Sequence, residues 1–299
     1  MEAVFEDKAI NILTLHDERL SQRQVQLDVL LLHEIDPVIS GNKWFKLKYY
    51  LEDAQAQGFK KIATFGGAYS NHIVAAAKAC NMLNISVKGI IRGEEPILLS
   101  QTLQEAKALG MELHFVRRED YKNKGKIKQL FPDYYWINEG GYGVLGAHGA
   151  ANILSLVKGI QLYSHIVLAV GTGTTFAGIV EASLPQQETI GISVLKNNFG
   201  LETEVKALLS EEAKVKKYSL LHDFHFGGYA KSSSEVLGFM NEIWRRHKLP
   251  TDFVYTAKAL KAIFLLNEEA KIPEGSRILF IHTGGLQGNR SLREGVLVY

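Results

Sequence analysis

The chain has 299 residues, of which 46% are hydrophobic and 22% charged, and its formal net charge at pH 7 is +2. Because the basic residues are scattered among acidic ones, this composition excludes the concentrated positive charge of a nucleic-acid-binding protein. No apolar run is long enough to cross a bilayer, and a single cysteine, Cys80, excludes an internal disulfide framework. We therefore expect a cytoplasmic globular protein, bound to neither nucleic acid nor membrane, with Cys80 as a buried thiol.

The first half of the chain predicts a small parallel sheet covered by helices. Residues 1–40 have no regular pattern apart from an apolar run over residues 25–32, which predicts a strand. After Lys43, apolar residues recur at helical spacing until Gly58. The basic run over residues 121–128 is expected to be a solvated face. Strands are expected over residues 61–65, 86–92, 112–116 and 135–138, and helices over residues 70–82 and 97–109.

The second half of the chain repeats this alternation. Together the two halves predict an α/β protein of two doubly wound open-sheet domains with a cleft between them. The expected strands cover residues 165–170, 189–195, 218–222 and 277–281. The expected helices cover residues 149–162, 201–209 and 256–269, with one more that ends at residue 182 and another capped by the serines at 232–234.

One lysine lies where a covalent bond to a cofactor could form. Lys43 stands between the glycine turn at Gly41 and the start of a predicted helix. A lysine in a partly desolvated pocket loses proton affinity, and its neutral amine can form a Schiff base with an aldehyde, usually pyridoxal phosphate. The chain has 34 lysines and arginines, and most such residues are solvated. The assignment of Lys43 therefore depends on other motifs.

A glycine-rich turn follows the first strand of the predicted small sheet. In open parallel sheets a ligand lies beyond the carboxyl ends of the strands, where helix N-termini present free amide groups. Residues 66–72 lie at such an end and have the sequence Gly-Gly-Ala-Tyr-Ser-Asn-His, so their backbone amides could bind a carboxylate. Ser70 and Asn71 could equally be helix caps. His72 by itself is typical of a packed or solvated histidine.

The turn at residues 171–175 is a stronger candidate for an anion site. Glycines let the backbone approach a ligand closely, while threonine hydroxyls and a helix N-terminus suit a phosphate dianion. A dinucleotide site is excluded because Phe176 replaces the third glycine, and a P-loop is excluded because no Gly-Lys-Ser/Thr follows. A merely tight strand-to-helix turn is the alternative. The candidate monophosphate site consists of Gly171, Thr172, Gly173, Thr174 and Thr175.

Seven short motifs occur in a fixed order along the chain. They are Ser40-Gly41-Asn42-Lys43 with Lys46-Leu47, residues 66–72, Glu139-Gly140-Gly141, residues 171–175, Gly228-Tyr229, residues 254–259 and His282-Thr283-Gly284-Gly285. In this order they resemble the 1-aminocyclopropane-1-carboxylate (ACC) deaminase and D-cysteine desulfhydrase family. The resemblance implies pyridoxal 5′-phosphate as cofactor, the tryptophan-synthase-β architecture (fold type II) and a homodimer. We expect residues 1–43 and 147–299 to form a larger cofactor-binding domain and residues 44–146 a smaller one.

The resemblance implies which residues hold the cofactor. Lys43 would be joined to it, and Asn71 would contact its phenolic oxygen. Residues 171–175 would bind its phosphate. Thr256 or Thr283 would stand near the pyridine nitrogen, where a neutral hydroxyl would leave that nitrogen unprotonated.

The resemblance also implies which residues act on a small amino-acid substrate. Ser70 would lie near the substrate carboxylate and Cα, with Asn71 and His72 beside it. Tyr229 and Tyr255 resemble the two active-site tyrosines of the family, with aromatic packing as the alternative. The freed amine of Lys43 would take the Cα proton as a general base.

Two positions favour a thiol substrate. ACC deaminases usually carry glutamate after the second tyrosine and glutamine after Ser-Asn, whereas this chain has Thr256 and His72, which resembles D-cysteine desulfhydrases. We expect a lyase that converts D-cysteine to pyruvate, ammonia and sulfide. The alternatives are an ACC deaminase that yields 2-oxobutanoate and ammonia, and a cofactor-binding protein without turnover. Trp44 and Phe45 depart from the family pattern, which leaves another D-amino acid open as the substrate.

Overall fold

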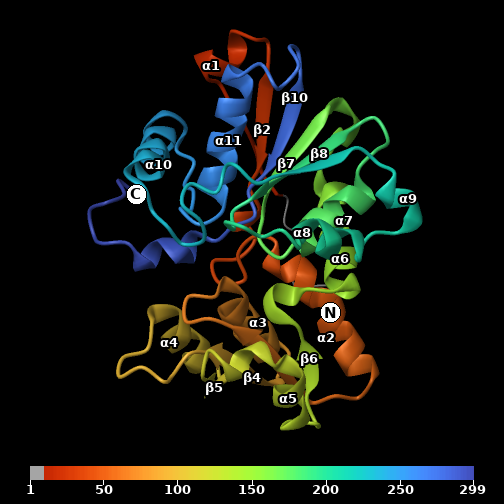
Figure 1. The fold of residues 1–299 in the computed structure, drawn as a ribbon, viewed down its shortest axis with the longest axis vertical. Coiled ribbons are helices and arrows are strands. Elements are labelled where there is room, and N and C mark those ends of the chain that lie inside the picture. The colour runs from red at the N-terminus through yellow and green to blue at the C-terminus, as the bar shows by residue number, and fades with distance from the viewer. Residues whose placement is uncertain (1–9) are drawn as a thin grey trace.

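The computed structural model describes residues 10–299, which form two open β-sheets covered by helices (Figure 1). The strand order is β1-β2-β10-β7-β8-β9 in the larger sheet and β5-β4-β3-β6 in the smaller one. Neighbouring strands are parallel except for β1 and β2. The larger sheet consists of β1 (Ile12–Leu15), β2 (Gln26–Leu30), β7 (His165–Val170), β8 (Glu188–Ser193), β9 (Tyr218–Leu221) and β10 (Arg277–Ile281). The smaller sheet consists of β3 (Lys61–Gly66), β4 (Ser86–Arg92), β5 (Glu112–Val116) and β6 (Tyr135–Ile137).

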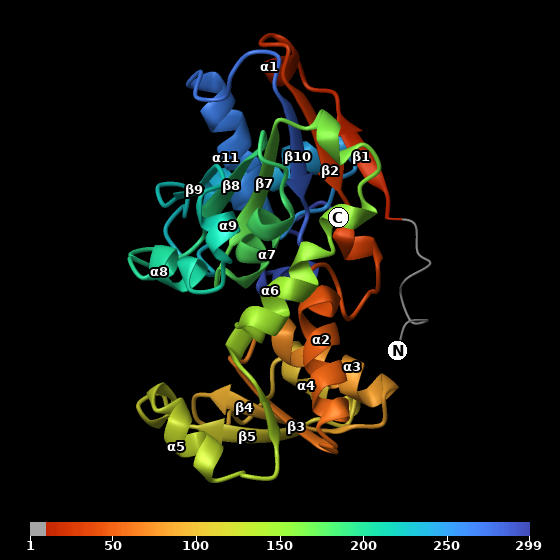
Figure 2. The same ribbon diagram turned by 90° about the vertical axis from the view of Figure 1, so that its right-hand side faces the viewer.

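Helices α2 and α6 lie where the two sheets meet, and they pack against each other (Figure 2). In the described part of the chain, no helix has both the length and the apolar character needed to cross a membrane. The helices are α1 (Glu18–Ser21), α2 (Lys43–Ala56), α3 (Asn71–Met82), α4 (Gln101–Ala108), α5 (Lys124–Gln129), α6 (Val144–Ala151), α7 (Thr174–Ala182), α8 (Leu201–Lys206), α9 (Glu211–Lys214), α10 (Ser234–His247) and α11 (Thr256–Glu268).

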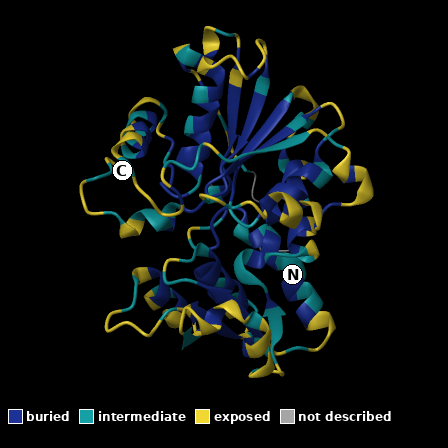
Figure 3. Ribbon diagram, viewed as in Figure 1, coloured by how far each residue is buried: buried dark blue, intermediate teal, exposed yellow. Residues whose placement is uncertain are grey.

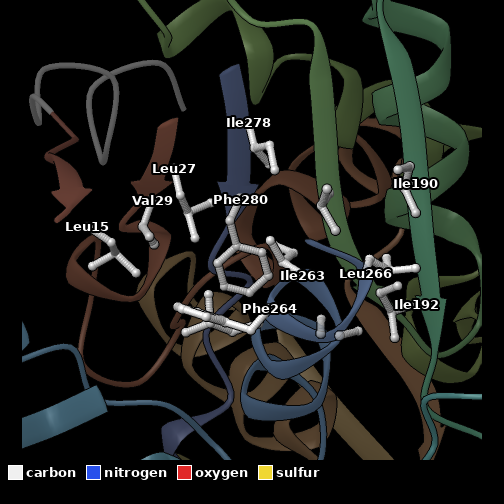
Figure 4. Packing of buried hydrophobic residues seen from close by; sticks show 14 of the residues in the cluster. Leu15, Leu27, Val29, Ile190, Ile192, Ile263, Phe264, Leu266, Ile278 and Phe280 are labelled. Atoms are coloured by element: carbon white, nitrogen blue, oxygen red, sulfur yellow. The ribbon is translucent and has the colours of Figure 1, made fainter. Parts of the chain in front are cut away.

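The central strands of the larger sheet are buried (Figure 3), because their alternate side chains belong to two apolar layers, one on each face. On β10, Phe280 packs with Ile263 and Phe264 of α11 (Figure 4). Its neighbours Leu279 and Ile281 face the opposite layer, which includes α6 and α7. Burial on both faces explains why these strands are near-continuous apolar runs in the sequence. The predicted α/β class with two open sheets is confirmed.

Most of the expected elements are confirmed, but residues 10–40 contain more structure than expected, and residues 1–9 of that predicted irregular segment lie outside the described residues. Strand β1 pairs antiparallel with β2, at the edge of the larger sheet. Sequence patterning missed β1 because the strand has only four residues, of which Leu15 alone is buried. The expectation for Cys80 is correct, since the thiol is buried in α3 and burial raises its pKa to about 12.

The helix expected over residues 149–162 was wrongly placed. Helix α6 covers Val144–Ala151, and only short 3₁₀ turns follow it. Gly149 lies inside α6, where an added Cβ would lie 1.9 Å from the carbonyl oxygen of Phe45 in α2. Glycine lowers helix propensity in isolation, but here it permits close packing of α6 on α2. The helix expected from residue 97 begins instead at Gln101, after Ser100 accepts a hydrogen bond from the Leu103 amide.

Candidate active site

The carboxyl ends of strands from both sheets border one cavity of about 580 Å³. Strands β7 and β10 of the larger sheet and β3 and β4 of the smaller sheet run into its walls. Of the site residues that the sequence predicts, Thr256 alone does not line this cavity. The predicted residues that do line it are Lys43, Ser70, Asn71, His72, Gly171, Thr172, Gly173, Thr174, Thr175, Tyr229, Tyr255 and Thr283.

Lys43 begins helix α2 with its amine in the cavity. Its Nζ donates a 2.5 Å hydrogen bond to Oδ1 of Asn42, and Nδ2 of Asn42 donates a 2.7 Å bond to Oγ1 of Thr175. Burial lowers the pKa of Lys43 to about 8, against a smaller opposing effect of the Asp252 carboxylate. A pKa near 8 leaves about a tenth of the amine neutral at pH 7, which is the form that attacks an aldehyde.

The loop before Lys43 is held against the loop that follows β10. The amide of Asn42 donates a 3.2 Å hydrogen bond to the carbonyl oxygen of Thr283. Gly41 has a φ of +70°, and an added Cβ would lie 1.9 Å from the same carbonyl oxygen. Only glycine combines this conformation with so close a backbone contact. The contact brings Thr283 and Lys43 to one cavity although 240 residues separate them in the chain.

The turn from β7 to α7 presents hydrogen-bond donors to the cavity. Gly173 caps α7 with a φ of +81°, and the first amide groups of a helix have no partner within the helix. Thr174 and Thr175 are buried, and the hydroxyls of Thr172 and Thr174 lie 3.2 Å apart. Amide donors, hydroxyls and the positive end of the helix dipole together suit a phosphate group.

The turn from β3 to α3 places Ser70 and Asn71 on the side of the cavity that the smaller sheet forms. Ser70 caps α3, since its Oγ accepts a 3.4 Å hydrogen bond from the amide of Ile73. The Oδ1 atom of Asn71 is buried and has no hydrogen-bond partner among the described residues. A buried polar atom without a partner is unfavourable, so the carboxamide of Asn71 is a candidate contact for a ligand.

His72 is a neutral histidine with one free ring nitrogen. The hydroxyl of Thr64 donates to the carbonyl oxygen of Ile137 at 2.9 Å and lies 2.8 Å from Nε2 of His72. Since that hydroxyl has one proton, Nε2 carries the ring proton and donates it to Thr64. Nδ1 is buried without a partner in the described structure. Burial, together with nearby Lys46 and Lys43, lowers the pKa of His72 well below its usual value.

Tyr229 and Tyr255 meet at the cavity with their ring centres 6.0 Å apart and their planes at 73°. Tyr229 is 45% exposed. Burial, with Tyr229 beside it, raises the pKa of Tyr255 well above its usual value. The phenol of Tyr255 therefore keeps its proton at ordinary pH and can act as a proton donor.

Thr256 does not line the cavity, because its side chain is hydrogen-bonded to Asp252 instead. Its hydroxyl donates a 2.7 Å hydrogen bond to Oδ1 of Asp252, which also accepts from the Thr256 amide at 2.9 Å. The other carboxylate oxygen accepts from the amides of Val254 and Tyr255. Asp252 thus accepts hydrogen bonds from the segment that leads into α11, and of the two threonines considered for the pyridine nitrogen only Thr283 lines the cavity.

Sequence patterns assigned no role to Lys46 and Arg92, which also line the cavity. Lys46 is buried, one helical turn after Lys43, and its Nζ donates to the carbonyl oxygen of Gly140. Burial and the neighbouring Lys43 lower the pKa of Lys46 well below its usual value. The i, i+3 spacing of the two lysines and the position of Arg92 at a strand's carboxyl end were available signals.

Comparison with known proteins identifies relatives over most of the chain. Residues 15–284 match the family model described as "Pyridoxal-phosphate dependent enzyme". A protein of Arabidopsis thaliana, named bifunctional D-cysteine desulfhydrase/1-aminocyclopropane-1-carboxylate deaminase, is 32% identical over 282 residues, which cover 84% of this chain and 70% of that protein. The D-cysteine desulfhydrase of Yersinia enterocolitica is 27% identical over 274 residues, 83% and 82% of the two chains.

A solved structure supports the fold. The crystal structure of an ACC deaminase homologue superimposes with a TM-score of 0.82 over 95% of this chain and 92% of that one, at 24% sequence identity. Pyridoxal phosphate also fits the residues of the cavity. Asn71 has an unpartnered Oδ1 that can contact the phenolic group. The turn at residues 171–175 offers hydrogen-bond donors to the phosphate. The amine of Lys43 can react with the aldehyde.

Proposed function

The chain belongs to the pyridoxal-phosphate dependent enzymes, and on this premise we propose that it is a deaminating lyase acting on D-cysteine. The reaction consumes one water and yields pyruvate, ammonia and hydrogen sulfide. One observation carries the proposal: Lys43 and Tyr255 line one cavity with pKa values shifted in opposite directions. When a site lowers the pKa of one group and raises the pKa of another, the first is suited to accept a proton and the second to keep and donate one.

The cofactor would be held by residues from both sheets. Lys43 would bind its aldehyde carbon, residues 171–175 its phosphate, Asn71 its phenolic oxygen, and Thr283 would face its pyridine nitrogen. When bound, the cofactor supplies an electron sink for the charge left at the substrate Cα. The neutral hydroxyl of Thr283 would not protonate the pyridine nitrogen, which limits how far that charge spreads.

The chain's own residues would orient the substrate and move its protons. Ser70 and the N-terminus of α3 would bind the substrate carboxylate. The amine of Lys43 would take the Cα proton, a role that typically contributes about two to four powers of ten in rate. Tyr255 would donate its proton to sulfur as the Cβ–S bond breaks. The resulting 2-aminoacrylate reacts with water to give pyruvate and ammonia.

ACC deamination is the second candidate because the Arabidopsis relative is named for both activities. Attack on the strained ring by a tyrosine would need a phenolate, and burial of Tyr255 disfavours that form. Thr256, which replaces the usual glutamate, is bonded to Asp252 and supplies no group to the cavity. Both observations favour the thiol substrate. A binding protein without turnover has little use for a matched proton donor and acceptor.

We also propose a cytoplasmic homodimer with two domains. The division into residues 1–43 with 147–299 and residues 44–146 is supported by the sheets, since the strands of each sheet fall within one of these two sets. The dimer remains a prediction of the family resemblance, and gel filtration with light scattering tests it.

Product formation tests the proposed function. Purified protein loaded with pyridoxal phosphate is incubated separately with D-cysteine, L-cysteine and ACC, and sulfide, pyruvate and 2-oxobutanoate are measured. We expect equal amounts of sulfide and pyruvate from D-cysteine, at a higher kcat/KM than for the other two compounds. Production of 2-oxobutanoate from ACC without sulfide from D-cysteine would replace the proposal by the second candidate.

A further inference from the structure

A second pocket, of about 610 Å³ and more open to solvent, adjoins the active-site cavity. We call it the basic pocket. Arg92 and Glu139 line both spaces, so a molecule bound in the cavity can extend into the pocket. Four cationic side chains against one carboxylate give the pocket an excess of positive charge. Its lining residues are Arg92, Arg118, Tyr121, Lys122, Lys124 and Glu139.

Residues that line the basic pocket end or follow strands of the smaller sheet, at the edge that also carries the Ser70 turn. Arg92 ends β4, while Arg118 and Lys122 follow β5 and Glu139 follows β6. These strands are parallel to β3, and so their carboxyl ends share the edge at which β3 ends. A Cβ added to Gly67, in the Ser70 turn, would lie 3.6 Å from Nη2 of Arg92. The pocket therefore neighbours the proposed position of the substrate carboxylate.

Most of the positive charge in the pocket has no partner of opposite sign. Lys124 forms a 2.7 Å ion pair with Glu139. Within residues 10–299, none of Arg92, Arg118 and Lys122 forms an ion pair or a side-chain hydrogen bond. Cations that converge on a pocket without counter-charges favour binding of an anion.

Tyr121 provides a second, independent indication of a ligand. The side chain is only 4% exposed and packs with Phe65, Ile90 and Ile127, whereas the lysines of residues 121–128 are exposed or half-buried, as expected for a solvated face. Its hydroxyl is buried and has no hydrogen-bond partner among the described residues. Burial and the neighbouring Glu139 carboxylate raise the pKa of Tyr121 above its usual value, so the hydroxyl keeps its proton, for which Glu139 and a bound anion would compete.

We propose that the basic pocket binds an anionic group on the substrate side chain, so that the preferred substrates are amino acids with a second negative charge. The inference rests on the proposed function for the position of the reacting end, and it names the substrate class. D-Cysteine has no such group, so the pocket adds nothing to its binding affinity. Where the anionic group is also a leaving group, as a sulfonate on Cβ is, it would depart as sulfite with the electron pair of its bond to Cβ while Lys43 takes the Cα proton, whereas a side-chain carboxylate would be bound but would stay attached.

Binding of charged and neutral side chains of equal size tests the proposal. The probes are D-aspartate with D-asparagine and D-glutamate with D-glutamine, titrated calorimetrically into the cofactor-loaded protein at low salt. We expect the acid of at least one pair to bind about tenfold or more tightly than its amide, since hydrogen bonds to charged groups are roughly twice as strong as neutral ones. The key variant is Arg118→Glu. Arg117→Glu is its control, because Arg117 is also exposed but does not line the pocket.

The preference for the acid should fall to within about twofold in Arg118→Glu and persist in Arg117→Glu. Equal affinities within both pairs in the wild-type protein would overturn the inference, and so would an equal loss of preference in the two variants. D-Cysteine turnover, measured on the same preparation, reports on the proposed function separately. Turnover without a charge preference would reject the basic pocket alone, whereas a charge preference without turnover would support the pocket and reject D-cysteine as substrate.

Discussion

Nζ of Lys258 donates a 2.6 Å hydrogen bond to the carbonyl oxygen of Gly228, the residue before Tyr229. Lys258 is fully buried in α11, whereas Tyr229 is nearly half exposed. Since α11 begins next to Tyr255, this hydrogen bond ties the loop of one cavity tyrosine to the helix that positions the other.

Replacing Lys258 with Met should impair catalysis by freeing the Tyr229 loop. Met keeps most of the aliphatic volume but leaves the Gly228 carbonyl without its donor, which should destabilise the fold by about 1–3 kcal/mol. We expect kcat with D-cysteine to fall about tenfold at temperatures where the protein stays folded, with a smaller change in KM. Lys261→Met, one turn further along α11, is the control. A lower melting temperature with unchanged kcat would show that Lys258 supports the fold alone.

Lys43→Ala should abolish turnover and leave the fold intact. The amine is proposed both to bind the cofactor and to take the Cα proton, and loss of the general base alone removes about two to four powers of ten in rate. Sulfide release from D-cysteine and far-ultraviolet circular dichroism measure the two effects. Lys60→Ala changes an exposed lysine after α2 and should match the wild type. Turnover at the wild-type rate in Lys43→Ala would disprove the assignment.

Capture of pyridoxal phosphate by cofactor-free protein should accelerate as the pH rises towards 8. The pKa of Lys43 in the folded protein is about 8, below its ordinary 10.5, so the amine is protonated below pH 8 and neutral above it. Only the neutral amine attacks the aldehyde. We expect the rate to rise about tenfold for each pH unit below 8 and to level off above it. Stopped-flow absorbance between pH 6 and 9.5 measures this, and a rate still rising steeply above pH 9 would contradict the lowered pKa.

Gly41→Ala should destabilise the protein more than Gly58→Ala. Both glycines have positive φ, +70° and +79°, but an added Cβ meets the Thr283 carbonyl oxygen at 1.9 Å in the first case and nothing within 4 Å in the second. Gly58→Ala therefore isolates the backbone strain, about 1–2 kcal/mol. Gly41→Ala adds a clash between two backbones, and it should also weaken cofactor retention because it displaces the loop before Lys43. Similar denaturant midpoints for the two variants would refute the close contact.

The alternation of strands and helices was readable from the sequence because its signals are local. Strand β7 is an uninterrupted apolar run, and the glycine turn after it marks the start of α7. The positions of Lys43, Asn71 and Thr175 at strand or helix ends followed from the same patterns. Short or tightly packed elements were not readable: β1 depends on pairing with β2, and α6 on glycines that fit against a neighbouring helix.

Local sequence patterns therefore indicate which residues stand at the carboxyl ends of which strands. Which of those ends face one cavity emerges only on folding, because the contact of Gly41 with Thr283 and the burial of Lys43 involve residues far apart in the chain. Folding also places Thr256 in a hydrogen bond with Asp252, while Thr283 lines the cavity. It brings Arg92 and Glu139 into one pocket with the cationic side chains around Tyr121. The physical reason is that burial, and with it proton affinity and charge balance, depends on the neighbours that folding supplies.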